Sequence, residues 1–124
     1  MRSFFLALLG TIVCTTACSG PRSAAEDIQK RQDSSSKLGF IAQQVDMYML
    51  RRGQPPATLA EVFTTEPVPQ DAWGNEYVIN LDVPSDKKYD VVSYGADGRA
   101  GGDASNADIS WLEIRSRPAS TNRL

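Results

Sequence analysis

The stretch from Tyr89 to Trp111 constrains the fold of this chain most, because an alternating run in it leads directly into a glycine-rich loop. Apolar and polar side chains alternate over residues 89–94, which predicts a half-buried β-strand. Residues 95–107 carry four glycines among small side chains, so backbone carbonyls and side-chain oxygens can converge there. The apolar pattern resumes over residues 109–114. We therefore expect a loop that two segments of the core hold at its ends.

Three carboxylates stand in or beside this loop: Asp97, Asp103 and Asp108. Oxygen ligands in a flexible loop are what a hard cation such as Ca²⁺ prefers. Glycine with aspartate also makes ordinary turns, and composition alone favours that interpretation over a metal site. The spacing lacks the alternate ligands and the closing glutamate of an EF-hand, so a metal here would have an irregular coordination built partly from carbonyl oxygens.

Several motifs follow one another in a specific order along the chain. In chain order they are DMY (46–48), PPAT (55–58), QDAWGNEY (70–77), YDVVSYGADG (89–98) and NADI (106–109). Together they resemble the periplasmic domain of the major, G-type pseudopilin of the type II secretion system. The resemblance covers about residues 37–111.

In that family the glycine-rich loop binds calcium. The resemblance implies ligation by the side chains of Asp97 and Asp108, with main-chain oxygens at Tyr94 and Arg99 as further ligands. Asp103 stands where related sequences often carry an acidic residue. With the resemblance counted, a Ca²⁺ site becomes the favoured interpretation of the loop.

A long helix is expected in the first half of the chain. Ser23 and Glu26 form the S-x-x-E pattern of a capping box, although three consecutive serines within residues 32–37 weaken the helix that follows. Gly53 with two nearby prolines ends it. Apolar side chains recur at three- and four-residue steps and predict one face packed on a sheet. These residues are Leu38, Ile41, Ala42, Val45, Tyr48 and Met49.

The second half of the chain predicts a short helix and a small sheet. Thr58 and Glu61 form a second capping-box pattern, and Trp73 beside turn residues is expected to pin a loop to the core. The predicted strands are residues 76–81, 89–94 and 109–114. We therefore predict an α+β, pseudopilin-like fold, in which one long N-terminal helix and a short helix pack on an antiparallel sheet of about three strands.

The first eighteen residues have the pattern of an export signal. Arg2 precedes an apolar run that is too short to span a bilayer. The small residues before Cys18 are typical of a bacterial lipoprotein signal, so we expect Cys18 to be lipidated and to anchor the protein in a membrane. The alternative is ordinary cleavage nearby, which leaves Cys18 as a free thiol. Ser19 after the cysteine favours the outer membrane over the inner one.

The expected organisation follows from these segments. Residues 1–17 are a lipoprotein signal peptide, residues 18–36 the lipidated cysteine, a tether and a weak helix start, residues 37–115 the pseudopilin G-like domain, and residues 116–124 a disordered tail. Pseudopilins carry a long apolar segment at the start of their N-terminal helix. No such segment occurs here, which puts assembly into a pseudopilus core in doubt.

The composition of the chain excludes several classes of function. The chain is 41% hydrophobic and 23% charged, with a net charge of −2 and no basic run that would suggest nucleic acid. It has no histidine, which excludes Ser/His/Asp and Cys/His catalysis, and we expect neither enzymatic activity nor a small-molecule substrate. We predict a lipid-anchored, calcium-stabilised structural or interaction protein on the periplasmic side of the envelope. Its expected partners are components of type II secretion or of a related pilus-like apparatus. The alternative is a lipoprotein that uses the same fold as a scaffold for an unrelated envelope partner.

Overall fold

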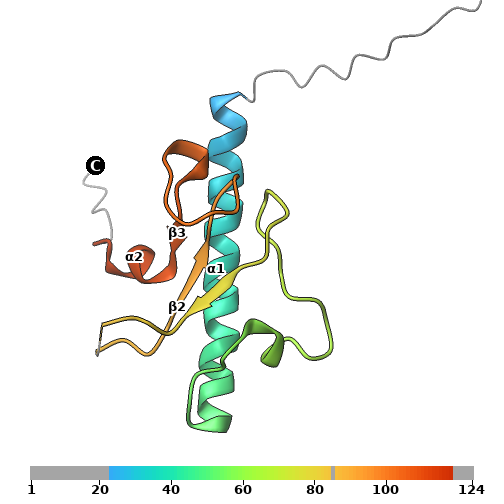
Figure 1. The fold of residues 1–124 in the computed structure, drawn as a ribbon, viewed down its shortest axis with the longest axis vertical. Coiled ribbons are helices and arrows are strands. Elements are labelled where there is room, and N and C mark those ends of the chain that lie inside the picture. The colour runs from blue at the N-terminus through green and yellow to red at the C-terminus, as the bar shows by residue number, and fades with distance from the viewer. Residues whose placement is uncertain (1–22, 85, 119–124) are drawn as a thin grey trace, which may run out of the picture.

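The computed structural model describes residues 23–84 and 86–118. The predicted signal peptide, the lipidation site at Cys18 and residues 119–124 of the predicted tail lie outside the described residues. The elements, in chain order, are α1 (Ala24–Arg52), the 3₁₀ turn η1 (Leu59–Glu61), β1 (Val78–Asn80), β2 (Asp90–Ser93), the 3₁₀ turn η2 (Ala104–Asn106), β3 (Ile109–Ser110) and α2 (Trp111–Ser116). The predicted α+β architecture is confirmed: one long helix lies across a three-stranded antiparallel sheet (Figure 1).

Both predicted ends of α1 are confirmed. At the start, the side chain of Ser23 accepts a hydrogen bond from the backbone N–H of Glu26 at 3.2 Å, as a capping box requires. At the end, Gly53 adopts a left-handed conformation (φ 77°), and its N–H donates to the carbonyl of Met49 at 2.7 Å. Glycine suits this position because it carries no Cβ that would clash in that conformation.

The serine run, expected to weaken the helix, lies within a continuous α1. The hydroxyls of Ser35 and Ser36 donate to carbonyls one turn back along the helix, at 2.8 and 3.0 Å. Ser34 is fully buried. Its hydroxyl accepts from the N–H of Ala72 at 3.0 Å, and its carbonyl accepts from the hydroxyl of Tyr77 at 2.9 Å. Tertiary packing therefore offsets the poor helix propensity of this segment.

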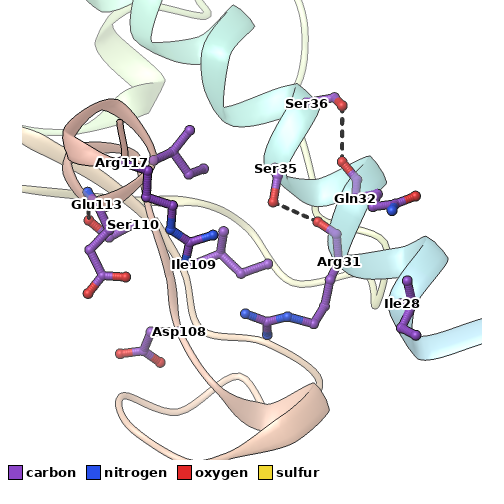
Figure 2. A pocket seen from close by; sticks show the side chains of 11 residues that line it. Ile28, Arg31, Gln32, Ser35, Ser36, Asp108, Ile109, Ser110, Glu113 and Arg117 are labelled. Atoms are coloured by element: carbon purple, nitrogen blue, oxygen red, sulfur yellow. Dashed lines mark hydrogen bonds between the residues drawn. The ribbon is translucent and has the colours of Figure 1, made fainter. Parts of the chain in front are cut away.

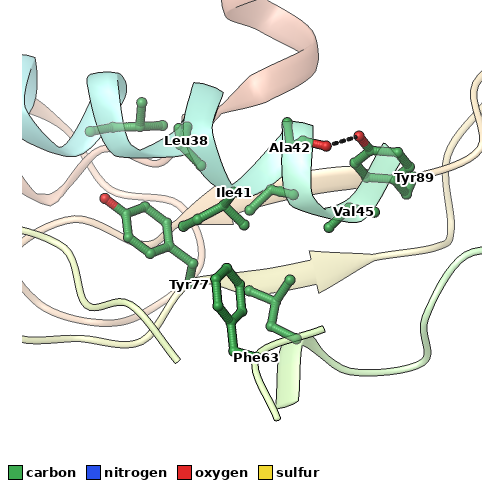
Figure 3. Packing of buried hydrophobic residues seen from close by; sticks show 10 residues of the cluster. Leu38, Ile41, Ala42, Val45, Phe63, Tyr77 and Tyr89 are labelled. Carbon is green, nitrogen blue, oxygen red and sulfur yellow. Dashed lines mark hydrogen bonds between the residues drawn. The ribbon is translucent and has the colours of Figure 1, made fainter. Parts of the chain in front are cut away.

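The core forms where the apolar face of α1 meets the sheet (Figure 3). Leu38, Ile41, Ala42 and Val45 are buried as the periodicity predicts, whereas Tyr48 and Met49 are half-buried at the edge of the face. The buried residues opposite them come from four other segments. They are Leu59, Phe63, Tyr77, Tyr89, Val91 and Ile109.

Two core tyrosines also donate hydrogen bonds to α1. The hydroxyl of Tyr77 bonds to Ser34, and that of Tyr89 bonds to the carbonyl of Ala42 at 2.9 Å and to the carboxylate of Asp46 at 2.7 Å. Burial raises the pKa of both tyrosines above their usual 10, and for Tyr89 the hydrogen bond to Asp46 raises it further. Both hydroxyls therefore stay protonated at a pH where an exposed tyrosine ionises. Their contribution to stability is full below about pH 10 and is lost progressively as the pH rises from there through the raised pKa.

Strand β2 is the centre of the sheet, in the order β1-β2-β3. Val78 pairs with Val92 on one side, and Ser93 pairs with Ile109 on the other. The prediction of a half-buried strand is wrong, because all four residues of β2 are buried and both α1 and α2 pack against it. The alternating pattern suggested one exposed face, but the polar residues Asp90 and Ser93 are also buried, each with hydrogen-bond partners of its own.

The segment predicted as a third strand over residues 109–114 divides into two elements. Only Ile109 and Ser110 form β3, and the chain then turns into α2. Ser110 caps this helix by accepting from the N–H of Glu113 at 3.2 Å, and the buried carboxylate of Asp90 accepts from the N–H of Leu112 at 3.0 Å. Two free N–H groups at the helix start are thus satisfied, which favours helix over strand.

The predicted capping box at Thr58 is also corrected. Leu59–Glu61 is a single 3₁₀ turn, and the side chain of Thr58 makes no capping hydrogen bond. The carboxylate of Glu61 instead accepts from the hydroxyl of Tyr48 on α1 at 2.8 Å. The turn is held by this contact and by the burial of Leu59 and Phe63.

A buried carboxylate organises the turn that leads into β1. One oxygen of Asp71 accepts from the N–H groups of Trp73 and Asn75 at 3.0 and 2.9 Å, and the other accepts from the hydroxyl of Ser93 at 2.7 Å. Trp73 packs half-buried against the core, as predicted. Asp71 therefore joins this turn to the central strand.

We predict that Asp71→Ala lowers the free energy of unfolding by about 3 kcal/mol, because three donors lose their acceptor in a buried place. Urea denaturation followed by circular dichroism measures this difference. The matched control is Asp82→Ala, which removes an exposed carboxylate and should change stability by less than about 0.5 kcal/mol. Equal stability of the two variants would contradict the role given to Asp71.

Candidate metal-binding loop

The loop over residues 95–108 leaves β2 and returns to β3, and hydrogen bonds close it at its base. The N–H of Ala96 donates to the carbonyl of Ser105 at 2.8 Å. The side-chain amide of Asn75 donates to the carbonyl of Gly95 at 2.9 Å, which ties the loop to the turn before β1. The loop is therefore a closed structure attached to the sheet.

Two glycines permit the close approach of backbone inside the loop. Gly95 (φ 71°) and Gly102 (φ 91°) both adopt left-handed conformations. A Cβ at Gly95 would lie 2.7 Å from the carbonyl oxygen of Ser105, and one at Gly102 would lie 2.8 Å from that of Asn106. Any other residue at these positions would push the two sides of the loop apart.

The structure turns both of the predicted ligand carboxylates onto the same short stretch of backbone. Asp97 is exposed, and one of its oxygens accepts from the N–H of Arg99 at 3.1 Å. Asp108 is half-buried, and both of its oxygens accept from the N–H of Gly101 at 3.0 Å. The two carboxylates thus approach residues 99–101 from opposite ends of the loop.

The other predicted ligands lie around this stretch. Tyr94 is half-buried directly after β2, and Arg99, whose N–H makes the contact with Asp97, is exposed. Asp103 is exposed and precedes η2, and its carbonyl, not its side chain, accepts from the N–H of Asn106 at 2.9 Å. Among residues 23–84 and 86–118, no three Asp, Glu, Cys or His side chains gather closely enough to hold a metal ion. A cation bound here would therefore need main-chain oxygens as well.

A contact between the helix and the loop was not predicted from the sequence. The guanidinium of Arg31 on α1 donates through Nη1 to the carbonyls of Ala104 and Ala107, at 3.1 and 2.9 Å. Figure 2 shows Arg31 reaching from the helix toward the segment that carries Asp108. No local pattern predicts this, because the partners are more than seventy residues apart. The one available signal is that Arg31 stands seven residues before Leu38, on the face of the helix that packs on the sheet.

A shallow groove of about 490 Å³ runs beside the loop, between the first turns of α1 and the β3–α2 segment. Arg31 and Asp108 both line it, with Arg117 and Glu113 further along (Figure 2). Its charges are of both signs, so its lining selects neither cations nor anions.

We predict that Gly95→Ala destabilises the protein by roughly 2 kcal/mol more than Gly101→Ala. Both glycines have positive φ and lose the same conformational freedom, but a Cβ at Gly101 meets no atom within 4 Å. The difference between the two variants thus isolates the clash with Ser105 and Asn106. Unfolding in urea measures it, and variants of equal stability would show that the loop does not need close packing at Gly95.

Comparison with known proteins supports the expected family. No match was found among curated proteins. Residues 54–111 match the family model described as type II secretion system (T2SS), protein G. The match begins just after α1 and runs through the sheet and the loop to the first residue of α2, and it supports a secretion-related structural protein of the cell envelope. None of the helices in the described ranges is long and apolar enough to cross a membrane. Residues 54–111 are therefore similar to type II secretion system protein G and form a pseudopilin-like domain.

Proposed function

We propose that this chain is a non-enzymatic, lipid-anchored and calcium-stabilised pseudopilin-like protein, which serves type II secretion or a related pilus-like apparatus as a structural or interaction module. The observation that carries the proposal is the closed loop over residues 95–108 in the part of the chain that matches protein G. Its two carboxylates converge on residues 99–101.

The chemistry of the available donors fits Ca²⁺. The side chains of Asp97 and Asp108 and the main-chain oxygens at Tyr94 and Arg99 are all oxygen donors, without nitrogen or sulfur. Hard cations prefer such a set, whereas zinc and copper prefer imidazole and thiolate, and this chain has no histidine. Asp103 has no side-chain cap bond, so its carboxylate is free to join the set or to stay in solvent.

Bound Ca²⁺ would supply positive charge to two carboxylates that backbone N–H groups now hold. The protein contributes the closed base of the loop, the close packing at its glycines and the attachment of both ends to paired strands. A loop arranged in this way links β2 to β3. A cation in the loop binds the folded state alone, and it therefore stabilises the sheet.

We predict that Ca²⁺ raises the melting temperature of the full-length protein in detergent, by an amount that reflects about 2.7 kcal/mol at a calcium concentration of about 100 times Kd. Asp97→Ala and Asp108→Ala should abolish the rise, because each removes an anionic ligand. Asp82→Ala, on the turn after β1, is the control and should keep it. Melting curves with calcium and with chelator measure the effect, and a wild-type curve that is the same in both would refute the calcium site.

The anchor places the domain close to a membrane surface. Cys18 precedes Ser23, the N-cap of α1, by five residues, which span at most about 18 Å when fully extended. An acylated cysteine there would therefore hold the first turns of α1 near the lipid headgroups. More than one acyl chain is expected on such a cysteine, which makes the anchor firm.

We predict that Cys18→Ser leaves an uncleaved or soluble precursor, because the acylated side chain is the anchor. Cys14→Ser, which alters the part of the signal removed on maturation, is the control and should leave both processing and membrane fractionation unchanged. Fractionation and intact mass spectrometry give the readout. A wild-type protein without a lipid adduct would exclude the anchor and leave the domain as a candidate for free export.

Co-purification separates the proposed function from the alternative of a scaffold with an unrelated partner. Recovery of secretion-system proteins with the membrane-extracted chain would support the secretion role. Recovery of other envelope proteins only would favour the scaffold.

A further inference from the structure

Arg31 makes a contact whose role the overall fold does not explain. In the part of the chain that the structure describes, it makes both of the hydrogen bonds that join α1 to the loop over residues 95–108. A single nitrogen, Nη1, donates to the carbonyls of Ala104 and Ala107, which stand at the two ends of η2. The bond to Ala107, at 2.9 Å, is partly buried, so water competes with it only weakly.

The turn that Arg31 holds is strained. Ala104 has a φ of 49° and is the one non-glycine residue with positive φ in residues 23–84 and 86–118. An L-residue in this conformation costs roughly 1–2 kcal/mol, so it persists only where its surroundings determine it. The carbonyl of Ala104 accepts from both the N–H of Ala107 and the guanidinium of Arg31. The helix therefore contributes directly to holding the strained turn.

The turn formed by η2 also sets the position of Asp108. Ala107, whose carbonyl Arg31 holds, directly precedes Asp108, and the carboxylate of Asp108 reaches across the loop to the N–H of Gly101. We infer that Arg31 is a positioning residue, which fixes η2 so that the loop presents Asp108 as a ligand before any cation binds. This inference rests on the proposed calcium site for its consequence, but the support of the loop by Arg31 is testable without calcium.

The charge of Arg31 and its hydrogen bonds predict opposite changes in calcium affinity when Arg31 is replaced. Its positive charge repels a cation, so an effect through charge alone would make calcium bind more tightly when Arg31 is neutralised. Its hydrogen bonds order the loop, so an effect through positioning would make calcium bind more weakly. Arg31→Gln removes both the charge and the fork of donors, whereas Arg31→Lys keeps the charge and loses the planar guanidinium.

The experiment uses the full-length protein in detergent and two readouts. In the presence of chelator, trypsin cleavage after the exposed Arg99 is followed by mass spectrometry, because cleavage there reports opening of the loop. Calcium affinity is measured by calorimetry. The control is Lys30→Gln, which removes a charge from the same turn of the helix, where Lys30 pairs with Glu26 and not with the loop.

Both Arg31 variants should be cleaved after Arg99 about tenfold faster than wild type, and should bind calcium about tenfold more weakly, whereas Lys30→Gln should match wild type. Cleavage of the Arg31 variants at the wild-type rate, or tighter calcium binding by Arg31→Gln, overturns the inference. If wild type binds no calcium while the Arg31 variants are still cleaved faster, the positioning role stands and the calcium site falls.

Discussion

The complete burial of β2 is the constraint on which the rest of the structure depends. A strand buried on both faces must satisfy its polar side chains internally, because an unpaired polar group there costs about 1–3 kcal/mol. Asp90 is satisfied by the start of α2, and Ser93 by Asp71 in the turn before β1. The two polar residues of β2 thus select the positions of the elements on either side of it. Apolar burial against α1 supplies the stability, while these bonds fix the arrangement.

The loop over residues 95–108 follows from the same pairing. Ser93, the last residue of β2, pairs with Ile109, the first of β3, so everything between them must leave and return at one point. Its two sides therefore run so close that Gly95 and Gly102 are the residues that fit. This crowding explains part of the oxygen-rich character of the loop. Backbone segments that pack closely, with no side chains between them, bring their carbonyl groups together.

How much the sequence predicts depends on whether the relevant signal is local. The apolar face of α1 and both of its ends were predicted correctly, because helix periodicity and capping are local patterns. The start of α2 was missed although Ser110 and Glu113 form a capping-box pattern, since the apolar residues around them also fit a strand. Arg31 and Asp71 could not be assigned in advance, because their partners become neighbours only once α1 and the turn pack on β2. The sequence did place Asp97 and Asp108 in one loop, but not their shared contact with residues 99–101.

The energetic character of the loop follows from how much of it the protein itself determines. Ordering a free loop costs about 1–2 kcal/mol per residue in backbone entropy, which a ligand must offset if the loop is disordered without it. Here the bond from Ala96 to Ser105, the amide of Asn75 and the two bonds of Arg31 order the loop through contacts within the protein itself. A cation that binds a loop ordered by such bonds loses little of its binding free energy to ordering the loop. Calcium bound there would add to the stability that these bonds provide, whereas zinc fingers fold only around their metal.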